Sequence, residues 1–182
     1  MLSLVLNFIL AIFLFKYLGD IVLVVWCMKK YGVPYAPTAM GMVRKMVKRL
    51  PLKRGMRVVE LGSGDGRVAV EMARVYLIKV VGVELNGWLL FWSRVRAAVS
   101  VFKKGKVRFE KKDLFSVKFN NFDGVYMYLL PVMLEKLRPK LEKELKKGSL
   151  VMSYDYPIKI SSKLRLKEKI EGKKPMWIYE RS

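Results

Sequence analysis

The stretch Arg57-Val-Val-Glu-Leu-Gly-Ser-Gly-Asp-Gly-Arg67 decides the fold class of this 182-residue chain. A short β-branched run leads into glycines at 62, 64 and 66, and the amphipathic segment from Val68 to Tyr76 follows. This order predicts a strand, a tight turn and a helix. Glycine has no Cβ and tolerates positive φ, so a ligand can approach the backbone of such a turn closely. The stretch therefore predicts a nucleoside site on an α/β sheet.

Acidic residues stand at the ends of the first three predicted strands. Glu60 ends the first, Glu84 ends the run that starts at Lys79, and Asp113 follows a third strand. Because the carboxyl ends of parallel strands meet at one edge of a sheet, these side chains should gather at the ligand. We expect Glu84 to accept hydrogen bonds from ribose hydroxyls and Asp113 to contact an adenine amine. For Asp113, a plain turn role is the alternative.

The glycine spacing separates two cofactor classes. Dinucleotide sites use G-x-G-x-x-G and hold a pyrophosphate at a helix N-terminus. This chain has G-x-G-x-G, with Asp65 inside the turn and Glu60 just before it. These carboxylates would repel a diphosphate but tolerate a ligand that carries a sulfonium and an amino group. The turn therefore predicts S-adenosylmethionine (SAM), and the alternative is a glycine turn of another α/β protein with Glu84 as a surface acid.

The rest of the chain continues the α/β pattern. We expect strands at about 57–61, 79–84, 106–110, 124–129 and 149–154, and helices at 66–76, 88–101 and 132–146. The segment from Lys163 to Arg181 alternates around Gly172 and predicts a strand pair. The predicted fold class is α/β: a Rossmann-like, seven-strand class I methyltransferase sheet, preceded by an N-terminal apolar helix.

Residues 1–28 are nearly all apolar, and two lysines follow them. A bilayer span needs about 20 such residues, so the segment predicts a transmembrane helix, with a buried or dimer-forming helix as the alternative. Lys16 and Asp20 interrupt it, but they stand four apart and can pair on one helix face. The positive-inside rule then predicts a single span with the catalytic domain in the cytoplasm.

Three domains follow from this pattern. They are a membrane anchor over 1–30, a linker and helix over 31–52, with Thr38 as the N-cap, and a SAM-dependent methyltransferase domain over 53–182. Lys and Arg outnumber Asp and Glu by 36 to 15. Such charge suits an anionic membrane surface, and it permits nucleic acid, although no arginine–aromatic stripe favours base stacking. The chain has no histidine and one cysteine, so no metal site is expected.

The end of the fourth strand points to the methyl acceptor. Tyr128-Leu-Leu-Pro131 stands where an Asn/Asp-Pro-Pro-aromatic sequence would indicate an amide or exocyclic amine. An aromatic and apolar rim suits transfer to a lysine amine, because positioning contributes most of the rate and an apolar site near a sulfonium lowers the lysine pKa. We expect Tyr128, Tyr154 and Asp155 to line the amine site, with core packing as the alternative for each.

Five stretches together resemble one enzyme family. They are Val33-Pro-Tyr-Ala-Pro-Thr38, Glu60-Leu-Gly-Ser-Gly-Asp-Gly-Arg67, Val81-Gly-Val-Glu-Leu-Asn86, Tyr128-Leu-Leu-Pro131 and Leu137-Arg-Pro-Lys-Leu-Glu-Lys-Glu-Leu-Lys-Lys-Gly148. In this order they resemble the seven-strand protein lysine methyltransferases, both the small archaeal enzymes and their membrane-anchored mitochondrial relatives. The similarity covers about residues 33–157.

The resemblance implies SAM-dependent methylation of lysine ε-amines in proteins. It also implies that Tyr35 and Thr38 close over the cofactor and substrate site. Because the mitochondrial relatives act on inner-membrane proteins and this chain has an apolar N-terminus, a membrane-protein lysine is the expected substrate. The alternatives are an RNA or small-molecule methyltransferase and a SAM-binding membrane scaffold. The predicted cofactor site comprises Tyr35, Thr38, Glu60, Gly62, Gly64, Gly66, Glu84, Asp113 and Tyr128.

Overall fold

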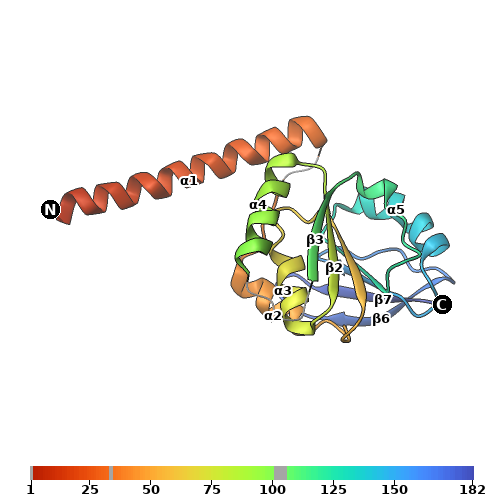
Figure 1. The fold of residues 1–182 in the computed structure, drawn as a ribbon. Coiled ribbons are helices and arrows are strands. Elements are labelled where there is room, and N and C mark those ends of the chain that lie inside the picture. The colour runs from red at the N-terminus through yellow and green to blue at the C-terminus, as the bar shows by residue number, and fades with distance from the viewer. Residues whose placement is uncertain (1, 33–34, 101–105) are drawn as a thin grey trace. The chain divides into compact units, whose positions relative to one another are not determined.

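A seven-stranded sheet in the order β3-β2-β1-β4-β5-β7-β6 forms the centre of the structure (Figure 1). The computed structural model describes residues 2–32, 35–100 and 106–182. The strands are β1 (Arg57–Leu61), β2 (Lys79–Glu84), β3 (Lys106–Lys111), β4 (Gly124–Met127), β5 (Leu150–Tyr154), β6 (Leu164–Ile170) and β7 (Met176–Arg181). The first five run parallel, and β7 lies antiparallel between β5 and β6. The predicted class I methyltransferase sheet is confirmed.

Helices cover both faces of the sheet (Figure 1). They are α2 (Met40–Val47), α3 (Arg67–Tyr76), α4 (Gly87–Val99) and α5 (Pro131–Glu144), with a short 3₁₀ helix η1 (Leu114–Ser116). Side chains alternate across the pleat of each strand. Val58 and Val80 pack in the core beneath α2 and α3, whereas Val59 and Val81 pack in the core beneath α5. Both strands next to the glycine turn are thus anchored on both faces.

The local boundaries follow from the residues at each element's end. β1 and β2 have the predicted bounds, and the C-terminal strand pair is present. The strand predicted to reach 129 ends at Met127, because Pro131 opens α5 and holds the preceding residue, Leu130, in extended backbone. The prediction that Thr38 caps the next helix is wrong. That helix starts at Met40, and its N-cap is Ala39, which makes no side-chain cap bond.

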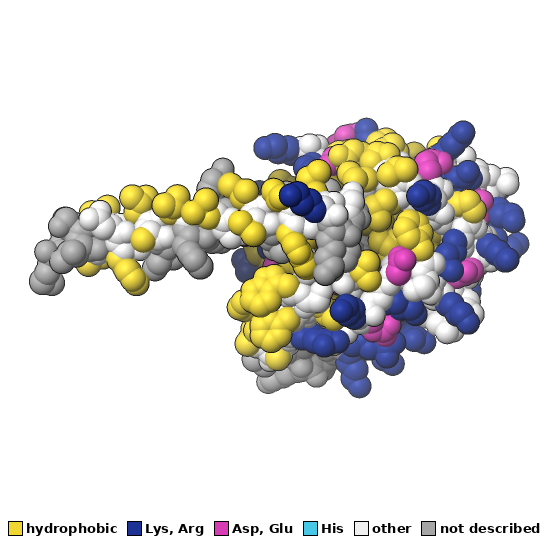
Figure 2. All heavy atoms as spheres, turned by 90° about the horizontal axis from the view of Figure 1, so that it is seen from above, with side chains coloured by type: hydrophobic (Ala, Val, Ile, Leu, Met, Phe, Trp, Pro, Cys, Tyr) yellow, Lys and Arg dark blue, Asp and Glu magenta, His cyan; other side chains and the backbone are white. Residues whose placement is uncertain are grey.

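The chain divides into two compact units, Met1–Pro37 and Thr38–Ser182. The first holds the 30-residue helix α1 (Leu2–Tyr31). Among the described residues, no helix is both long and apolar enough to cross a membrane, so the span predicted over 1–28 is not found there. The side chains of Lys16 and Asp20, predicted to pair, lie outside the described ones. Where α1 side chains are described, hydrophobic ones are exposed along its length (Figure 2).

The Phe109 ring of β3 sets the approach between the sheet and the glycine turn. A Cβ built at Gly66 would lie 2.4 Å from the Phe109 Cζ, and one built at Gly82 would lie 2.4 Å from two other ring carbons. No carbon can approach another so closely without moving it. Two glycines far apart in sequence are therefore required by one aromatic ring, and a larger residue at either would push β3 away from the turn.

We expect Gly82→Ala to lower the free energy of unfolding by about 1–3 kcal/mol, because the added methyl overpacks against Phe109. Urea unfolding measures this change. The matched control is Gly41→Ala on α2, where an added Cβ meets nothing within 4 Å; it should be neutral or stabilising by up to about 1 kcal/mol. In a Phe109→Leu background the cost of Gly82→Ala should shrink. An equal cost in both backgrounds would contradict this packing account.

Candidate functional site

The candidate site lies at the carboxyl ends of β1, β2, β4 and β5, where ligands bind in open α/β sheets. Between β1 and α3 the backbone passes through Gly62, Gly64 and Gly66, with φ values of 68°, 54° and 76°. These left-handed conformations strain residues that carry a Cβ. The predicted glycine turn is therefore present, with Gly66 as the N-cap of α3.

Glu60 lies beneath this turn rather than on its surface. Its side chain is buried, and its Oε2 accepts a hydrogen bond of 2.8 Å from the Ala69 backbone N–H in the first turn of α3. Burial raises the pKa of the Glu60 carboxyl well above its ordinary value, the Ala69 bond opposes this, and the nearby Asp65 and Glu84 add to it. The structure shows Glu60 capping a helix; its predicted contact with the cofactor stays a prediction.

Glu84 connects the end of β2 to the glycine turn. Its Oε2 accepts a hydrogen bond of 2.9 Å from Gly64 N–H, and its Oε1 accepts one of 2.8 Å from Asn86 N–H. The carboxylate is half-buried at the rim of the turn. This location agrees with the predicted contact to a ribose, because a carboxylate can accept several hydrogen bonds at once.

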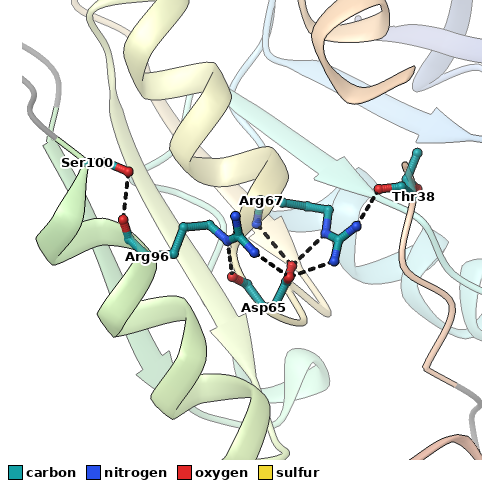
Figure 3. Close-up of polar contacts among 5 residues, drawn as sticks. All are labelled: Thr38, Asp65, Arg67, Arg96 and Ser100. Atoms are coloured by element: carbon teal, nitrogen blue, oxygen red, sulfur yellow. Dashed lines mark hydrogen bonds and ion pairs between the residues drawn. The ribbon is translucent and has the colours of Figure 1, made fainter. Parts of the chain in front are cut away.

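Asp65 forms an ion-pair network with two arginines (Figure 3). Arg67 approaches in a bidentate manner, with Nε 2.8 Å from Oδ1 and Nη2 2.7 Å from Oδ2. Arg96 of α4 places Nη2 2.7 Å from Oδ2 and donates from Nε to the Asp65 backbone oxygen. Arg67 also donates from Nη1 to the Thr38 backbone oxygen at 2.6 Å. One carboxylate therefore joins the turn, α4 and the segment before α2.

This network corrects the electrostatic reason given for excluding a diphosphate. Burial raises the pKa of Asp65, but the hydrogen bonds and charges of Arg67 and Arg96 outweigh it, so the pKa lies below its ordinary value. Asp65 is thus ionised, but two guanidinium groups face its single charge. The turn does not present a free carboxylate to the ligand. The sequence could suggest Arg67 from its spacing, but Arg96 reaches Asp65 only through the packing of α4.

The remaining predicted cofactor residues differ in what the structure shows. Asp113 is exposed and caps η1, where its Oδ1 accepts a hydrogen bond of 2.9 Å from Phe115 N–H. This is the turn role kept open as the alternative, and the adenine contact stays a prediction. Tyr35 belongs to the N-terminal unit, so its closing role also stays a prediction.

Tyr128, after β4, and Asp155, after β5, lie together. The Tyr128 hydroxyl donates to Asp155 Oδ2 at 3.3 Å. Sequence reasoning missed a third member, Lys174 of the β6–β7 turn, whose Nζ lies 2.6 Å from Asp155 Oδ2 and donates to the Tyr128 hydroxyl. Nothing in the pattern around Lys174 marks it, because it reaches the site only through the antiparallel pairing of β7 with β5.

Tyr154 supports this cluster from the core. Its side chain is buried, and its hydroxyl donates to the Met42 Sδ of α2 at 2.8 Å. Its ring meets the Tyr128 ring edge to face, with centroids 5.2 Å apart. The structure thus gives Tyr154 the packing role that was the alternative to its prediction as an amine-site residue, while Tyr128 and Asp155 are brought together as predicted.

The residues at the turn fit SAM. The glycines leave the backbone open, and Glu84 offers a carboxylate beside Gly64. Leu129, next to Tyr128, packs so close to the turn that its Cδ2 would lie 3.3 Å from a Cβ at Gly62. A nucleoside at the turn would thus lie beside the residues that carry the amine cluster. The arrangement can bring a methyl donor and an amine together at one edge of the sheet.

Comparisons with known proteins place this geometry in context. A family model described as the ANTKMT methyltransferase domain matches residues 60–163. A protein-lysine N-methyltransferase of Saccharolobus islandicus is 36% identical over 132 residues, which are 70% of this chain and 79% of that protein. The adenine nucleotide translocase lysine N-methyltransferase of Mus musculus is 31% identical over 151 residues, 81% of this chain but only 63% of the mouse protein.

A third relative and a solved structure complete the comparison. A lysine N-methyltransferase of Rattus norvegicus, named for ATP synthase, is 35% identical over 130 residues, and the chain spans only 59% of its length. The RNA methyltransferase from Salinibacter ruber, in complex with S-adenosyl-L-homocysteine, has a TM-score of 0.71 and 27% identity; the match covers 80% of this chain and 94% of that one. The bound ligand of that structure supports SAM as the cofactor.

Replacing Glu60 tests the electrostatics of the turn. Because burial raises its pKa, the folded protein keeps a proton that the unfolded chain loses, so the free energy of unfolding should fall as pH rises from the unfolded to the folded pKa. Glu60→Gln keeps an oxygen for Ala69 N–H. It should raise the free energy of unfolding at pH 7 by roughly 1 kcal/mol and flatten this slope, measured by urea unfolding between pH 4 and 8.

Asp65→Asn is the control of opposite sign. Its stabilising contribution is present above the unfolded pKa and is lost as pH falls through the lower folded pKa. The variant should therefore lose stability at pH 7 and lose part of the acid sensitivity of the protein. Loss of stability at pH 7 in the Glu60→Gln variant would show that the charged form is favoured in the fold after all.

Proposed function

Because the chain belongs to the family of the ANTKMT methyltransferase domain, we propose that it is a SAM-dependent protein-lysine N-methyltransferase. The observation that carries the proposal is the Tyr128–Asp155 pair beside the glycine turn, since a hydroxyl and a carboxylate can hold a lysine ε-amine there. The relative from Saccharolobus islandicus bears this activity in its name, and its match covers most of both chains.

Each residue at the site then has a defined task. SAM is the cofactor, and when bound it supplies an electrophilic methyl group on a sulfonium. The glycine turn and Glu84 hold the nucleoside, and Tyr128 and Leu129 form one wall of the acceptor site. Asp155 Oδ2 orients the substrate ammonium and is the nearest oxygen to accept its proton. Positioning of this kind can supply most of the rate in a displacement reaction.

The substrate class proposed is a lysine of a membrane-associated protein, with the catalytic domain on the cytoplasmic side and α1 as the anchor. Residues 1–28 are nearly all apolar in sequence. Described hydrophobic side chains exposed on α1 are Val5, Leu6, Phe8, Leu10, Leu14, Leu18, Ile21, Val22, Val25, Trp26 and Met28. Exposed apolar residues on this scale are typical of interaction surfaces.

The second unit offers its own support for a membrane surface. Trp88, Phe91 and Trp92 cluster on α4 with ring centroids 5.5–6.0 Å apart, and each is about half exposed. Aromatic rings of this kind are enriched where bilayers meet water. The net charge of +21 attracts anionic headgroups, and Lys and Arg side chains spread over the face seen in Figure 2.

RNA methylation is the second candidate, and one observation favours it: the Salinibacter ruber structure is an RNA methyltransferase. The net charge of the chain also permits binding to RNA. The absence of an Asn/Asp-Pro-Pro-aromatic sequence after β4 argues against an exocyclic base amine as the acceptor.

The test uses the purified chain with methyl-labelled SAM and a cell lysate separated into membrane, soluble-protein and RNA fractions. We expect label in membrane protein, recovered as methyllysine after acid hydrolysis. Glu84→Ala is the companion variant: loss of the ribose contacts should weaken SAM binding about ten- to hundredfold in calorimetry, with the fold retained. Label confined to RNA would overturn the proposed activity, and unchanged SAM affinity would refute the role of Glu84.

Vesicle flotation tests the membrane proposal. The full chain should float with vesicles of phosphatidylcholine and phosphatidylglycerol at 7:3, and less with pure phosphatidylcholine, because anionic headgroups add attraction. Charges placed on the apolar surface of α1, in Phe8→Asp/Leu14→Asp, should reduce flotation at least severalfold. Val132→Asp, at an exposed position on α5, is the matched control. A full chain that stays unbound to both vesicles would sink the anchor assignment.

A further inference from the structure

Lys174 places its ammonium group inside the candidate acceptor site. Its Nζ lies 2.6 Å from Asp155 Oδ2, donates to the Tyr128 hydroxyl, and stands 4.8 Å from the centroid of the Tyr128 ring. A carboxylate, a hydroxyl and an aromatic face are the three contacts that would hold the ε-amine of a substrate lysine. The chain thus satisfies its own lysine-binding contacts with a lysine of its own.

The position of this contact excludes a merely distant surface ion pair. Tyr128 directly follows β4, and Asp155 directly follows β5, its neighbour in the sheet. Leu129, the next residue after Tyr128, packs against Gly62 of the cofactor turn. The Lys174 ammonium therefore lies at the carboxyl edge of the sheet, on the side where the methyl donor would be held.

We propose that Lys174 is an internal occupant of the substrate-lysine site, which competes with the incoming lysine and must leave before methyl transfer. The inference rests on the proposed function and deepens it, because it assigns Tyr128 and Asp155 as the binding site for the lysine head group. It also makes the β6–β7 turn, residues 171–175, the element that opens and closes this site.

Charge explains why Lys174 is an occupant and not itself a ready methyl acceptor. Its hydrogen bonds to Asp155 and Tyr128 raise its pKa above the ordinary lysine value, against a smaller opposing effect of burial. The amine is therefore protonated in this contact, and a protonated amine has no lone pair for attack. A substrate lysine meets the same carboxylate, so it needs the donor's positive charge nearby to lose its proton.

The contact is built so that it can open. The Lys174 side chain is 38% exposed, and ion pairs exposed to this degree are weak. Asp155 is held independently of Lys174: its backbone φ is 75°, and its N–H donates to the Pro175 oxygen at 2.8 Å. The lysine can thus swing into solvent while the carboxylate stays in place for a substrate.

The chain provides a matched control next to the residue under test. Lys173 is exposed and has the same chemistry, but Lys174 alone makes the Tyr128 and Asp155 contacts among the described residues. Lys174→Met removes the ammonium and keeps an unbranched stem of similar length. Lys173→Met makes the same chemical change outside the site, and thermal unfolding of both variants checks that each is folded.

The experiment measures binding of Nα-acetyl-lysine methylamide to the full chain without SAM, by NMR titration. Removing the competitor should tighten binding by Lys174→Met about tenfold relative to the wild type, whereas Lys173→Met should bind like the wild type. Adding Asp155→Asn to Lys174→Met should abolish the gain. Equal affinity of the wild type and Lys174→Met, or a gain that survives Asp155→Asn, would overturn the proposal.

Methyl transfer separates this inference from the proposed function. With a lysine peptide and SAM, Lys174→Met should lower KM severalfold with little change in kcat, because competition acts on binding only. If the wild type and Lys174→Met methylate with equal KM, the competition is refuted and the proposed function stands. If both bind SAM but neither methylates any protein, the proposed function fails, while the binding result still decides what Lys174 occupies.

Discussion

The neutralisation of one carboxylate, that of Asp65, holds the cofactor turn in its conformation. A half-buried acid costs free energy unless its charge is compensated, and here two guanidinium groups compensate it. Each guanidinium continues to another segment: Arg67 reaches the Thr38 backbone, and Arg96 brings α4 against the turn. The turn is thus braced on two sides by charged hydrogen bonds, and its glycines can keep left-handed backbone without adding bulk beneath the ligand.

Three carboxylates within a few residues of the ligand site show three ways of managing negative charge. Glu60 is buried and bonded to a helix N–H, Asp65 is paired with arginines, and Glu84 bonds the backbone of the turn while remaining half-buried. Only the last has an oxygen placed at the rim. The acids that the sequence presents as one group therefore have separate tasks, and Glu84 is the one whose position best suits a ligand.

A lysine-rich enzyme that methylates lysines must also control its own side chains. This chain has 36 lysines and arginines, and one of the lysines occupies the contacts meant for the substrate. The same carboxylate that attracts a substrate ammonium attracts any other ammonium within reach. An occupant that is partly exposed and weakly held leaves the site competent while keeping Asp155 paired. Charge in this protein thus serves both an anionic surface and the acceptor site.

Much of the architecture was predictable because it depends on local chemistry. The β-branched run before the glycines and the run ending at Glu84 predicted β1 and β2 at their observed bounds, and Gly172 marked the C-terminal turn. Errors came where a neighbouring residue changed the local geometry, as when Pro131 ended β4 early and Ala39, not Thr38, capped α2. The short helix capped by Asp113 has too few residues to leave a periodic pattern.

The sequence by itself determined the sheet, the glycine turn, the acidic strand ends and the choice of a methyltransferase, because spacing and backbone preference act along the chain. Tertiary structure alone decided which acids are free and which are paired. Arg96 meets Asp65 from 31 residues away, Phe109 requires Gly66 and Gly82 together, and Lys174 enters the acceptor site through strand pairing. Contacts of this kind arise from packing between elements, and no local pattern records them.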